Sequence, residues 1–245
     1  MIETESIPRR QMTLFFMIDK SGSMAGNKIA SVNDAIKNVL PIIGEISDEN
    51  PDAEIRVAAL EFSNGVEWKY DRPMEGKDFI WQDVKADGLT SLGAACTELS
   101  SKLSKRGFMS SLGGCYAPAI ILLSDGKPTD NFEAGLRKLQ DNNWFKYAIK
   151  IAIAIGDKAD MNVLEQFTGN LEAVIKVHNI DALKAMIRVI AVTSSQIGSK
   201  SSTASETTKQ ELIIKEVTEA VKNTNGAESA AAPAADPTDS YDIWD

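Results

Sequence analysis

Residues 12–23 read MTLFFMIDKSGS, and this stretch decides how the chain folds. Its first seven residues are apolar without interruption, which is typical of a strand buried on both faces of a parallel sheet. The next five residues, 19–23, bring one acid, two hydroxyls and a glycine into the loop behind that strand. Open parallel sheets bind ligands at the carboxyl ends of their strands, so this loop is the first candidate for a functional site.

Strands and helices alternate along the rest of the chain. Further strands are expected at residues 55–62, 66–70, 119–123, 148–155 and 173–177, and helices at residues 27–43, 92–103, 131–140, 163–167, 181–194 and 209–223. Asn27 is the expected N-cap of the first helix, and Pro41 is expected to kink or split that helix near its end. Residues 66–70 alternate like the return strand of a hairpin. The order predicts an α/β fold with a mostly parallel sheet, one antiparallel edge strand, and helices on both faces.

The composition narrows the class of protein. A chain of 245 residues is long enough for one α/β domain with a tail. The formal net charge is −9, and the body before the acidic residues 226–245 is nearly balanced, so neither nucleic acid nor an anionic membrane is expected as a partner. Cys96 and Cys115 are too few for a disulfide framework and lack the clustering of a zinc site. Residues 1–10 do not read as a signal peptide and no apolar run has membrane-spanning length, so a cytoplasmic location is expected.

Composition also divides the chain into five predicted parts. They are an N-terminal extension (residues 1–11), a folded domain (12–194), a Ser/Thr/Lys-rich linker (195–208), an amphipathic helix (209–224) and a disordered acidic tail (225–245). The helix carries an apolar stripe that includes Ile213, Val217 and Val221. This stripe either folds back on the domain or serves as a partner helix. Self-association is expected through this helix or through the tail.

Three polar loops adjoin predicted strand or helix ends and carry the candidate ligands. They are residues 19–23 (DKSGS), 87–93 (DGLTSLG) and 124–130 (SDGKPTD). Asp19 and Asp125 are carboxylates, while Ser21, Ser23 and Thr90 offer neutral hydroxyl oxygens. Mg²⁺ takes six oxygen ligands and suits sites with one or two carboxylates, so the set predicts Mg²⁺, with Mn²⁺ or Ca²⁺ as alternatives. Two carboxylates only cancel the charge of the ion, which leaves it attractive to one more anionic oxygen from outside. The carboxylates of the acidic tail would therefore dock on the metal of a neighbouring molecule.

These five positions resemble the metal-ion-dependent adhesion site (MIDAS) of von Willebrand factor A (VWA) domains. Asp19, Ser21 and Ser23 match the first loop of that motif, Thr90 the second and Asp125 the third, and the resemblance covers about residues 12–194. It implies the VWA fold, a Rossmann-like, doubly wound sheet with the ion at its carboxyl edge. The hydroxyls then touch the ion directly, and the aspartates do so directly or through water.

The resemblance further implies a non-enzymatic module that binds a protein partner, whose Asp or Glu takes the last place on the ion. In some relatives this event moves the last helix of the domain, here the one expected from Asp181. Residues 88–93 and 124–130 look like those of compact bacterial intracellular VWA proteins associated with tellurite resistance, stress response and phage defence. The resemblance therefore implies a role in a bacterial multi-protein assembly.

Two alternatives stay open. A Mg²⁺-dependent phosphatase or nuclease would use the cation to activate water. Against it, no third carboxylate, phosphate-cradling loop or separate general base accompanies the candidate ligands. A VWA subunit of a chelatase-like ATPase machine would use the same site, and the sequence does not separate it from the first interpretation.

Other polar and aromatic residues have ordinary structural explanations. Asp130 is expected to cap the helix that begins at Asn131, and Lys20 and Lys127 are expected to face solvent. His178 stands alone at a strand end without a nucleophile motif and is not expected to be catalytic. Three aromatic residues are expected to pack around the hairpin rather than form a binding patch: Trp68, Tyr70 and Trp81.

Overall fold

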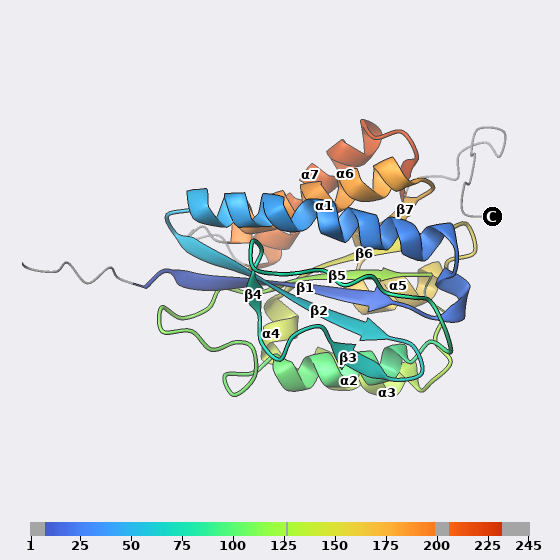
Figure 1. The fold of residues 1–245 in the computed structure, drawn as a ribbon, viewed down its shortest axis with the longest axis horizontal. Coiled ribbons are helices and arrows are strands. Elements are labelled where there is room, and N and C mark those ends of the chain that lie inside the picture. The colour runs from blue at the N-terminus through green and yellow to red at the C-terminus, as the bar shows by residue number, and fades with distance from the viewer. Residues whose placement is uncertain (1–7, 126, 199–205, 232–245) are drawn as a thin grey trace, which may run out of the picture.

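One twisted sheet runs through the molecule between two layers of helices (Figure 1). The computed structural model describes residues 8–125, 127–198 and 206–231. The strands are β1 (Arg10–Asp19), β2 (Ala53–Phe62), β3 (Val66–Trp68), β4 (Met74–Glu75), β5 (Ala119–Ser124), β6 (Ile149–Ile155), β7 (Val174–Val177) and β8 (Ala227–Ser229). Within the described residues they form an eight-stranded sheet in the order β3-β2-β1-β5-β6-β7-β8, with β4 also paired to β2.

The pairing confirms the predicted mostly parallel sheet. β2, β1, β5, β6 and β7 run parallel to one another. β3 pairs antiparallel with β2, as the hairpin pattern of residues 66–70 predicts. β4 also pairs antiparallel with β2, although no strand is expected there from the sequence. The strand order reverses between β1 and β5, and such a reversal is where doubly wound sheets bind ligands.

The apolar run of the sequence becomes the centre of the sheet. β1 is buried from its second residue to its last, and its alternate residues enter two different cores. Leu14, Phe16 and Ile18 pack beneath one helix layer, whereas Phe15 and Met17 pack beneath the other. This double burial is why the strand has no polar alternation.

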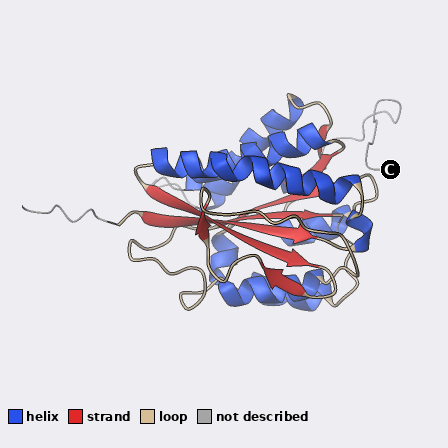
Figure 2. Cartoon of the chain, viewed as in Figure 1, coloured by secondary structure: helices blue, strands red, loops and turns tan. Residues whose placement is uncertain are grey.

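The helices divide between the two faces (Figure 2). The first layer holds α1 (Asn27–Glu49), α6 (Ile180–Gly198) and α7 (Glu206–Lys222), and the second holds α2 (Leu92–Lys102), α3 (Phe132–Gln140), α4 (Asn143–Tyr147) and α5 (Met161–Thr168). Two short 3-10 turns, Gly22–Met24 and Leu171–Ala173, complete the regular structure. No helix among the described residues combines the length and apolar character needed to cross a membrane.

The first helix differs from its prediction at both ends. Its N-cap is Gly26 rather than Asn27, because the chain turns there with a φ of 78°, a conformation that favours glycine. The helix is not split at Pro41 but continues to Glu49. Pro41 lies on the exposed side of the helix, while Leu40 and Ile43 stay packed in the core, so tertiary packing outweighs the backbone hydrogen bond that proline removes.

The C-terminal region is more ordered than predicted. Residues 227–229 fall in the segment expected to be disordered, yet they form β8, antiparallel to β7. Their sequence, Ala-Glu-Ser, has no strand pattern, and the strand exists because the edge of β7 offers unpaired backbone groups. The His178 N–H donates to the Gly226 carbonyl (2.8 Å), and the Ala230 N–H to the Val174 carbonyl (3.0 Å). The rest of the expected tail, residues 232–245, lies outside the described residues.

The apolar stripe of α7 folds back on the domain. Ile213, Val217 and Val221 are buried in the same core as α1 and α6. Gln210 fastens the start of the helix, because its Oε1 accepts the Lys150 N–H and its Nε2 donates to the Lys150 carbonyl, both at 3.0 Å. The stripe is therefore occupied inside the molecule. The division of the chain into extension, domain, linker, helix and tail stays a prediction.

Replacing Gln210 by Ala should loosen α7 from the sheet. The change leaves the Lys150 N–H and carbonyl without their partner, so we expect the free energy of unfolding to fall by about 1–3 kcal/mol. Urea unfolding followed by circular dichroism measures this loss. Gln140→Ala, on the exposed end of α3, is the matched control and should cost less than about 0.5 kcal/mol. Equal effects of the two changes would contradict the role given to Gln210.

Candidate metal centre

The two predicted carboxylate ligands lie side by side at the reversal of strand order. Asp19 is the last residue of β1, and Asp125 directly follows β5. The strands are parallel neighbours, with Ile18 opposite Leu123, so both acids reach the same edge of the sheet. The negative charge of Asp125 adds to the burial that raises the pKa of Asp19.

Asp19 is held in one orientation by two neighbours. Its Oδ1 accepts the Ser21 N–H (2.8 Å), and its Oδ2 accepts the Ser124 hydroxyl (2.6 Å). The side chain is fully buried, and burial raises the pKa of this carboxyl, although the hydrogen bonds from Ser124 and Ser21 oppose the rise. A proton therefore competes with a cation for Asp19 more strongly than for an exposed aspartate. Sequence reasoning missed Ser124, and its only signal was a hydroxyl next to Asp125.

Asp125 carries an incomplete hydrogen-bond set. The residue is 3% exposed, and its Oδ1 is buried without a hydrogen-bond partner among the described residues. A buried carboxylate oxygen in this state is costly unless a cation or a water meets it. The Asp125 carbonyl, in contrast, accepts the Asp160 N–H at 2.7 Å, so the backbone on which the side chain stands is fixed.

The remaining ligands of a cation here would have to be hydroxyls. Within the described residues, no three His, Cys, Asp or Glu side chains gather so that they could hold a metal ion. Ser21 and Ser23 have their Oγ atoms 3.0 Å apart, so the first loop presents a pair of neutral oxygens. Ser21 is buried and Ser23 is exposed, which gives the group one side that opens to solvent. Two acids with hydroxyls and an open side fit a hard divalent cation that keeps a free coordination place.

Backbone hydrogen bonds bring the second loop to the first. The Gly22 N–H donates to the Gly88 carbonyl (3.0 Å), and the Asp87 N–H to the Lys20 carbonyl (2.8 Å). Asn33 of α1 supports the irregular segment before this loop, because its side chain accepts the Val84 N–H (2.8 Å) and donates to the Val84 carbonyl (2.9 Å). The approach of Thr90 to the metal edge is thus fixed by residues far away in the sequence.

The third loop is tied to the second by side chains and backbone together. The Thr129 N–H donates to the Thr90 carbonyl (2.9 Å), and the Thr129 hydroxyl accepts the Thr90 N–H (3.0 Å). α2 and α3 then approach so closely that a Cβ on Gly135 would overlap the Gly93 carbonyl. Only glycine permits this approach, which keeps the start of α2 beside the loop that carries Asp125.

Asp130 has a different partner from the predicted one. Its two carboxylate oxygens accept the N–H groups of Gly93 (2.9 Å) and Ala94 (2.8 Å), so it caps α2 from another part of the chain. The helix that was expected to need it, α3, is capped by Asn131, whose side chain accepts the Ala134 N–H at 3.1 Å. The capping prediction was wrong because spacing along the sequence does not reveal a helix start brought near by packing.

Most of the charged and aromatic residues that the sequence singled out contact other side chains. Lys20 does not face solvent as expected, because its Nζ lies 2.9 Å from Oε2 of the buried Glu61, which Lys69 also contacts. Lys127 is exposed, as predicted. His178 lies at the end of β7, three strands from β1, with its ring between Asp157 (3.1 Å) and Glu228 (3.7 Å). The aromatic residues pack as predicted: Trp68 on Phe15 and Phe108, Tyr70 on Phe79, and Trp81 on Phe79.

Comparison with known proteins places this geometry in a family. The sequence model of the von Willebrand factor type A domain matches residues 13–189. The fold is similar to that of a von Willebrand factor type A protein from Catenulispora acidiphila, with a TM-score of 0.58 and 16% identity over 76% of this chain and 43% of that one. It is also similar to mussel byssus proximal thread matrix protein 1 with a zinc-occupied MIDAS motif, with a TM-score of 0.56 and 16% identity over 76% and 48% of the two chains.

A third similar structure is the ArnB paralog VWA2 from Sulfolobus acidocaldarius, with a TM-score of 0.54 and 22% identity over 74% of this chain and 45% of that one. This chain spans less than half the length of each of these solved chains. At such identities the structural likeness concerns the fold alone. The sequence match, however, extends over well more than half of the chain. The chain therefore belongs to the family of von Willebrand factor type A domains.

Proposed function

We propose that this chain is a non-enzymatic binding module that holds one divalent cation through Asp19, Ser21, Ser23, Thr90 and Asp125. The module binds a protein partner through an acidic residue of that partner. The observation that carries the proposal is the buried Oδ1 of Asp125, which has no hydrogen-bond partner among the described residues, near the oriented carboxylate of Asp19. A buried carboxylate oxygen without a hydrogen-bond partner is costly, and a bound cation would remove that cost. The atom also lies at the reversal of strand order, where sheets of this kind bind ligands.

Each residue has a separate task in this proposal. The two aspartates supply negative charge equal to that of the ion, and Ser124 with the Ser21 N–H fixes the direction of Asp19. The hydroxyls of the first two loops supply oxygens without further charge. When bound, the cation supplies a positive centre that attracts one more anionic oxygen. The exposed side at Ser23 is where that oxygen arrives.

The donor set favours Mg²⁺, with Mn²⁺ or Ca²⁺ as close alternatives. All five proposed ligands are oxygens, which suit hard cations, whereas zinc sites usually include His or Cys. In the mussel protein, however, the MIDAS motif is occupied by zinc. We therefore treat the choice of ion as a quantity to measure, with Mg²⁺ expected first.

Binding is favoured over hydrolysis by what surrounds the two aspartates. Among the described residues no third acid joins them in a metal-binding group, and His178 is engaged three strands away. Two-metal or base-assisted hydrolysis would need such groups. A cytoplasmic assembly in a bacterium, linked to tellurite resistance, stress response or phage defence, remains our proposal for the setting. This part of the proposal rests on the resemblance of the sequences of residues 88–93 and 124–130 to those of bacterial intracellular VWA proteins.

Asp125→Asn should separate stability from metal binding. Without metal, the variant should be at least as stable as the wild type, because the amide removes a buried charge that lacks a partner. Mg²⁺ at about 100 times its dissociation constant should stabilise the wild type by about 2.7 kcal/mol, a rise in Tm of ~5–10 °C, and leave the variant unchanged. Thermal melts in EDTA, Mg²⁺, Mn²⁺, Ca²⁺ and Zn²⁺ measure both effects. Asp87→Asn, an exposed change in a neighbouring loop, should behave as the wild type. The same Mg²⁺ shift in Asp125→Asn would remove Asp125 from the ligand set.

Partner binding should depend on the same residues. Wild type, an Asp19→Ala/Asp125→Ala variant and Asp87→Asn are each used to capture proteins from native lysate, with Mg²⁺ and with EDTA. A genuine partner should be recovered by the wild type and Asp87→Asn in Mg²⁺, and fall to background in EDTA or with the double variant. Replacing the partner's contacting Asp or Glu by Ala should abolish capture. Recovery of the same protein in EDTA and by a folded double variant would show that it binds elsewhere.

A further inference from the structure

A second polar cleft lies at the opposite edge of the sheet from the metal centre. It has a volume of about 400 Å³ and opens between the amino ends of β1 and β2, the turn before β4, and the end of α2. α2 begins at the metal edge and ends here, so the two sites stand at opposite ends of that helix. We call it the basic cleft after the four cationic residues that line it: Arg56, Arg72, Lys102 and Arg106.

Positive charge in the basic cleft exceeds the negative charge that lines it. Two acids, Glu54 and Asp71, line the cleft together with the four cations. Two of the cations have acidic partners: Arg56 is paired with Glu54 and lies 3.5 Å from Glu75, and Lys102 lies 3.9 Å from Glu98 on its own helix. Arg72 and Arg106 are exposed, and within the described residues neither has an acidic partner. Two unpaired guanidinium groups in a protein of net charge −9 form a local surplus that attracts carboxylates.

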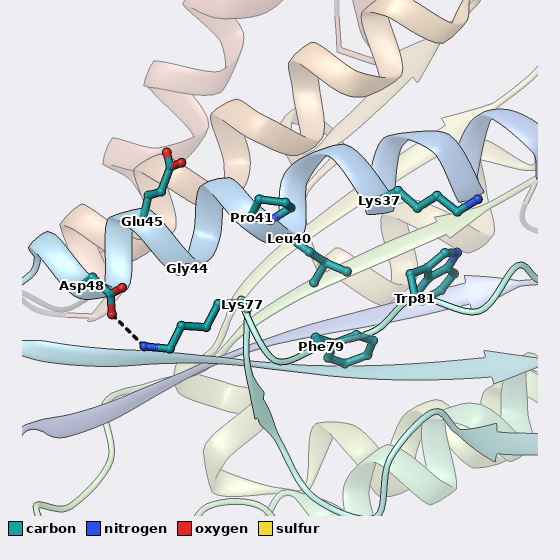
Figure 3. Close-up of a pocket in the computed structure, with 10 residues that line it drawn as sticks. Lys37, Leu40, Pro41, Gly44, Glu45, Asp48, Lys77, Phe79 and Trp81 are labelled. Carbon is teal, nitrogen blue, oxygen red and sulfur yellow. Dashed lines mark hydrogen bonds and ion pairs between the residues drawn. The ribbon is translucent and has the colours of Figure 1, made fainter.

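A neighbouring groove shows the contrast. Between α1 and residues 76–81, Figure 3 shows a groove with apolar side chains at its floor and charges on its rim. Those charges neutralise one another, because Lys77 pairs with Asp48 (3.3 Å) and Lys37 with Asp83 (2.6 Å). The two clefts therefore differ, because the lysines of this groove have acidic partners, whereas Arg72 and Arg106 of the basic cleft have none among the described residues.

We propose that the basic cleft binds the acidic end of the same molecule, residues 239–245. The tail contains Asp236, Asp239, Asp242 and Asp245 and no Lys or Arg, and the last three of these aspartates fall in the proposed segment. The arginine side chains are suited to donate paired hydrogen bonds to such carboxylates.

The chain is long enough to make the connection. β8 runs antiparallel to β7 and so leads away from the metal edge, with Ala230 bonded beside Val174. Through the strand registers, Val174 lies level with Met17 of β1. The path from there to the start of β2 covers roughly five residues along the strands and four strand spacings, or ~25 Å. Extended chain from residue 231 spans up to ~26 Å at Asp239, ~36 Å at Asp242 and ~46 Å at Asp245, so the tether is long enough for these three aspartates to reach the cleft, but not for Asp236.

Such docking would also serve the proposed function of the metal centre. A free acidic segment on the same chain would compete with the partner's Asp or Glu for the cation. Holding it at the opposite edge removes this competitor. The docking itself requires no metal, so it stands or falls separately from the metal proposal.

The test uses the full chain with its four tail aspartates changed to Asn, which leaves the basic cleft without its own ligand. The probe is a synthetic peptide of residues 232–245, titrated by calorimetry in EDTA. We expect binding that weakens as salt rises and that falls by ~tenfold or more in a host that also carries Arg72→Gln and Arg106→Gln. Lys105→Gln, exposed on the same loop but outside the cleft, is the matched control and should leave binding unchanged. The wild-type chain should bind the peptide roughly tenfold more weakly, because its own tail competes at high effective concentration.

Three results would overturn the proposal. One is a peptide that fails to bind, or that binds the arginine variant and the Lys105 control equally. Another is binding that requires Mg²⁺ and disappears in Asp19→Ala/Asp125→Ala, which would assign the tail to the metal centre instead. The third is equal affinity for the wild-type and neutral-tail hosts, or a wild type that dimerises in sedimentation while the neutral-tail chain does not. Melting curves of every host confirm that each remains folded.

Discussion

The hydrogen bond from the Ser124 hydroxyl to Asp19 joins the ends of β1 and β5, and the proposed metal centre depends on the strand pairing beneath it. Parallel pairing brings the end of β5 beside the end of β1, so Asp125 follows within reach of Asp19. Neither acid is free to move away, because each stands at the end of a strand buried on both faces. The sheet thus keeps two carboxylates close together in a place where neither is well solvated.

The two buried aspartates lower the stability of the metal-free protein, and the same carboxylates are the proposed ligands of the cation. Burial raises the pKa of Asp19, and Asp125 retains an oxygen that has no hydrogen-bond partner in the described part of the chain. Both conditions disfavour the metal-free protein, since unpaired buried charge is costly. In the proposed function, a cation that binds here would remove this free-energy cost, so the metal-bound protein would be more stable than the metal-free protein. The packing of β1 and β5 between two helix layers supplies the stability that tolerates this cost.

The fold was largely predictable, since apolar runs and alternating elements determine a mostly parallel sheet with helices on both faces. The departures have local causes. β8 has no strand pattern in Ala-Glu-Ser and forms only because β7 offers an edge. Pro41 would break an isolated helix, but α1 is held on both sides of it by buried residues. Sequence periodicity reports the average environment of a segment and cannot report a partner that arrives from elsewhere in the chain.

The same distinction applies to the site. That Asp19 and Asp125 would reach one edge of the sheet was predictable from the sequence, because each follows or ends a buried parallel strand. The parts that fix the third loop to α2 were not, because they are contacts across long sequence separations: Asp130 caps α2, and Gly135 lies against Gly93. These contacts make the start of α2 a rigid support for Thr90, and they carry the helix from the metal edge to the basic cleft at its far end. One helix therefore separates a centre built from anionic ligands from a surface with surplus cations, and the sheet keeps the two at fixed distance. Opposite charges that are held apart by a rigid element cannot neutralise each other. Each remains available to its own ligand.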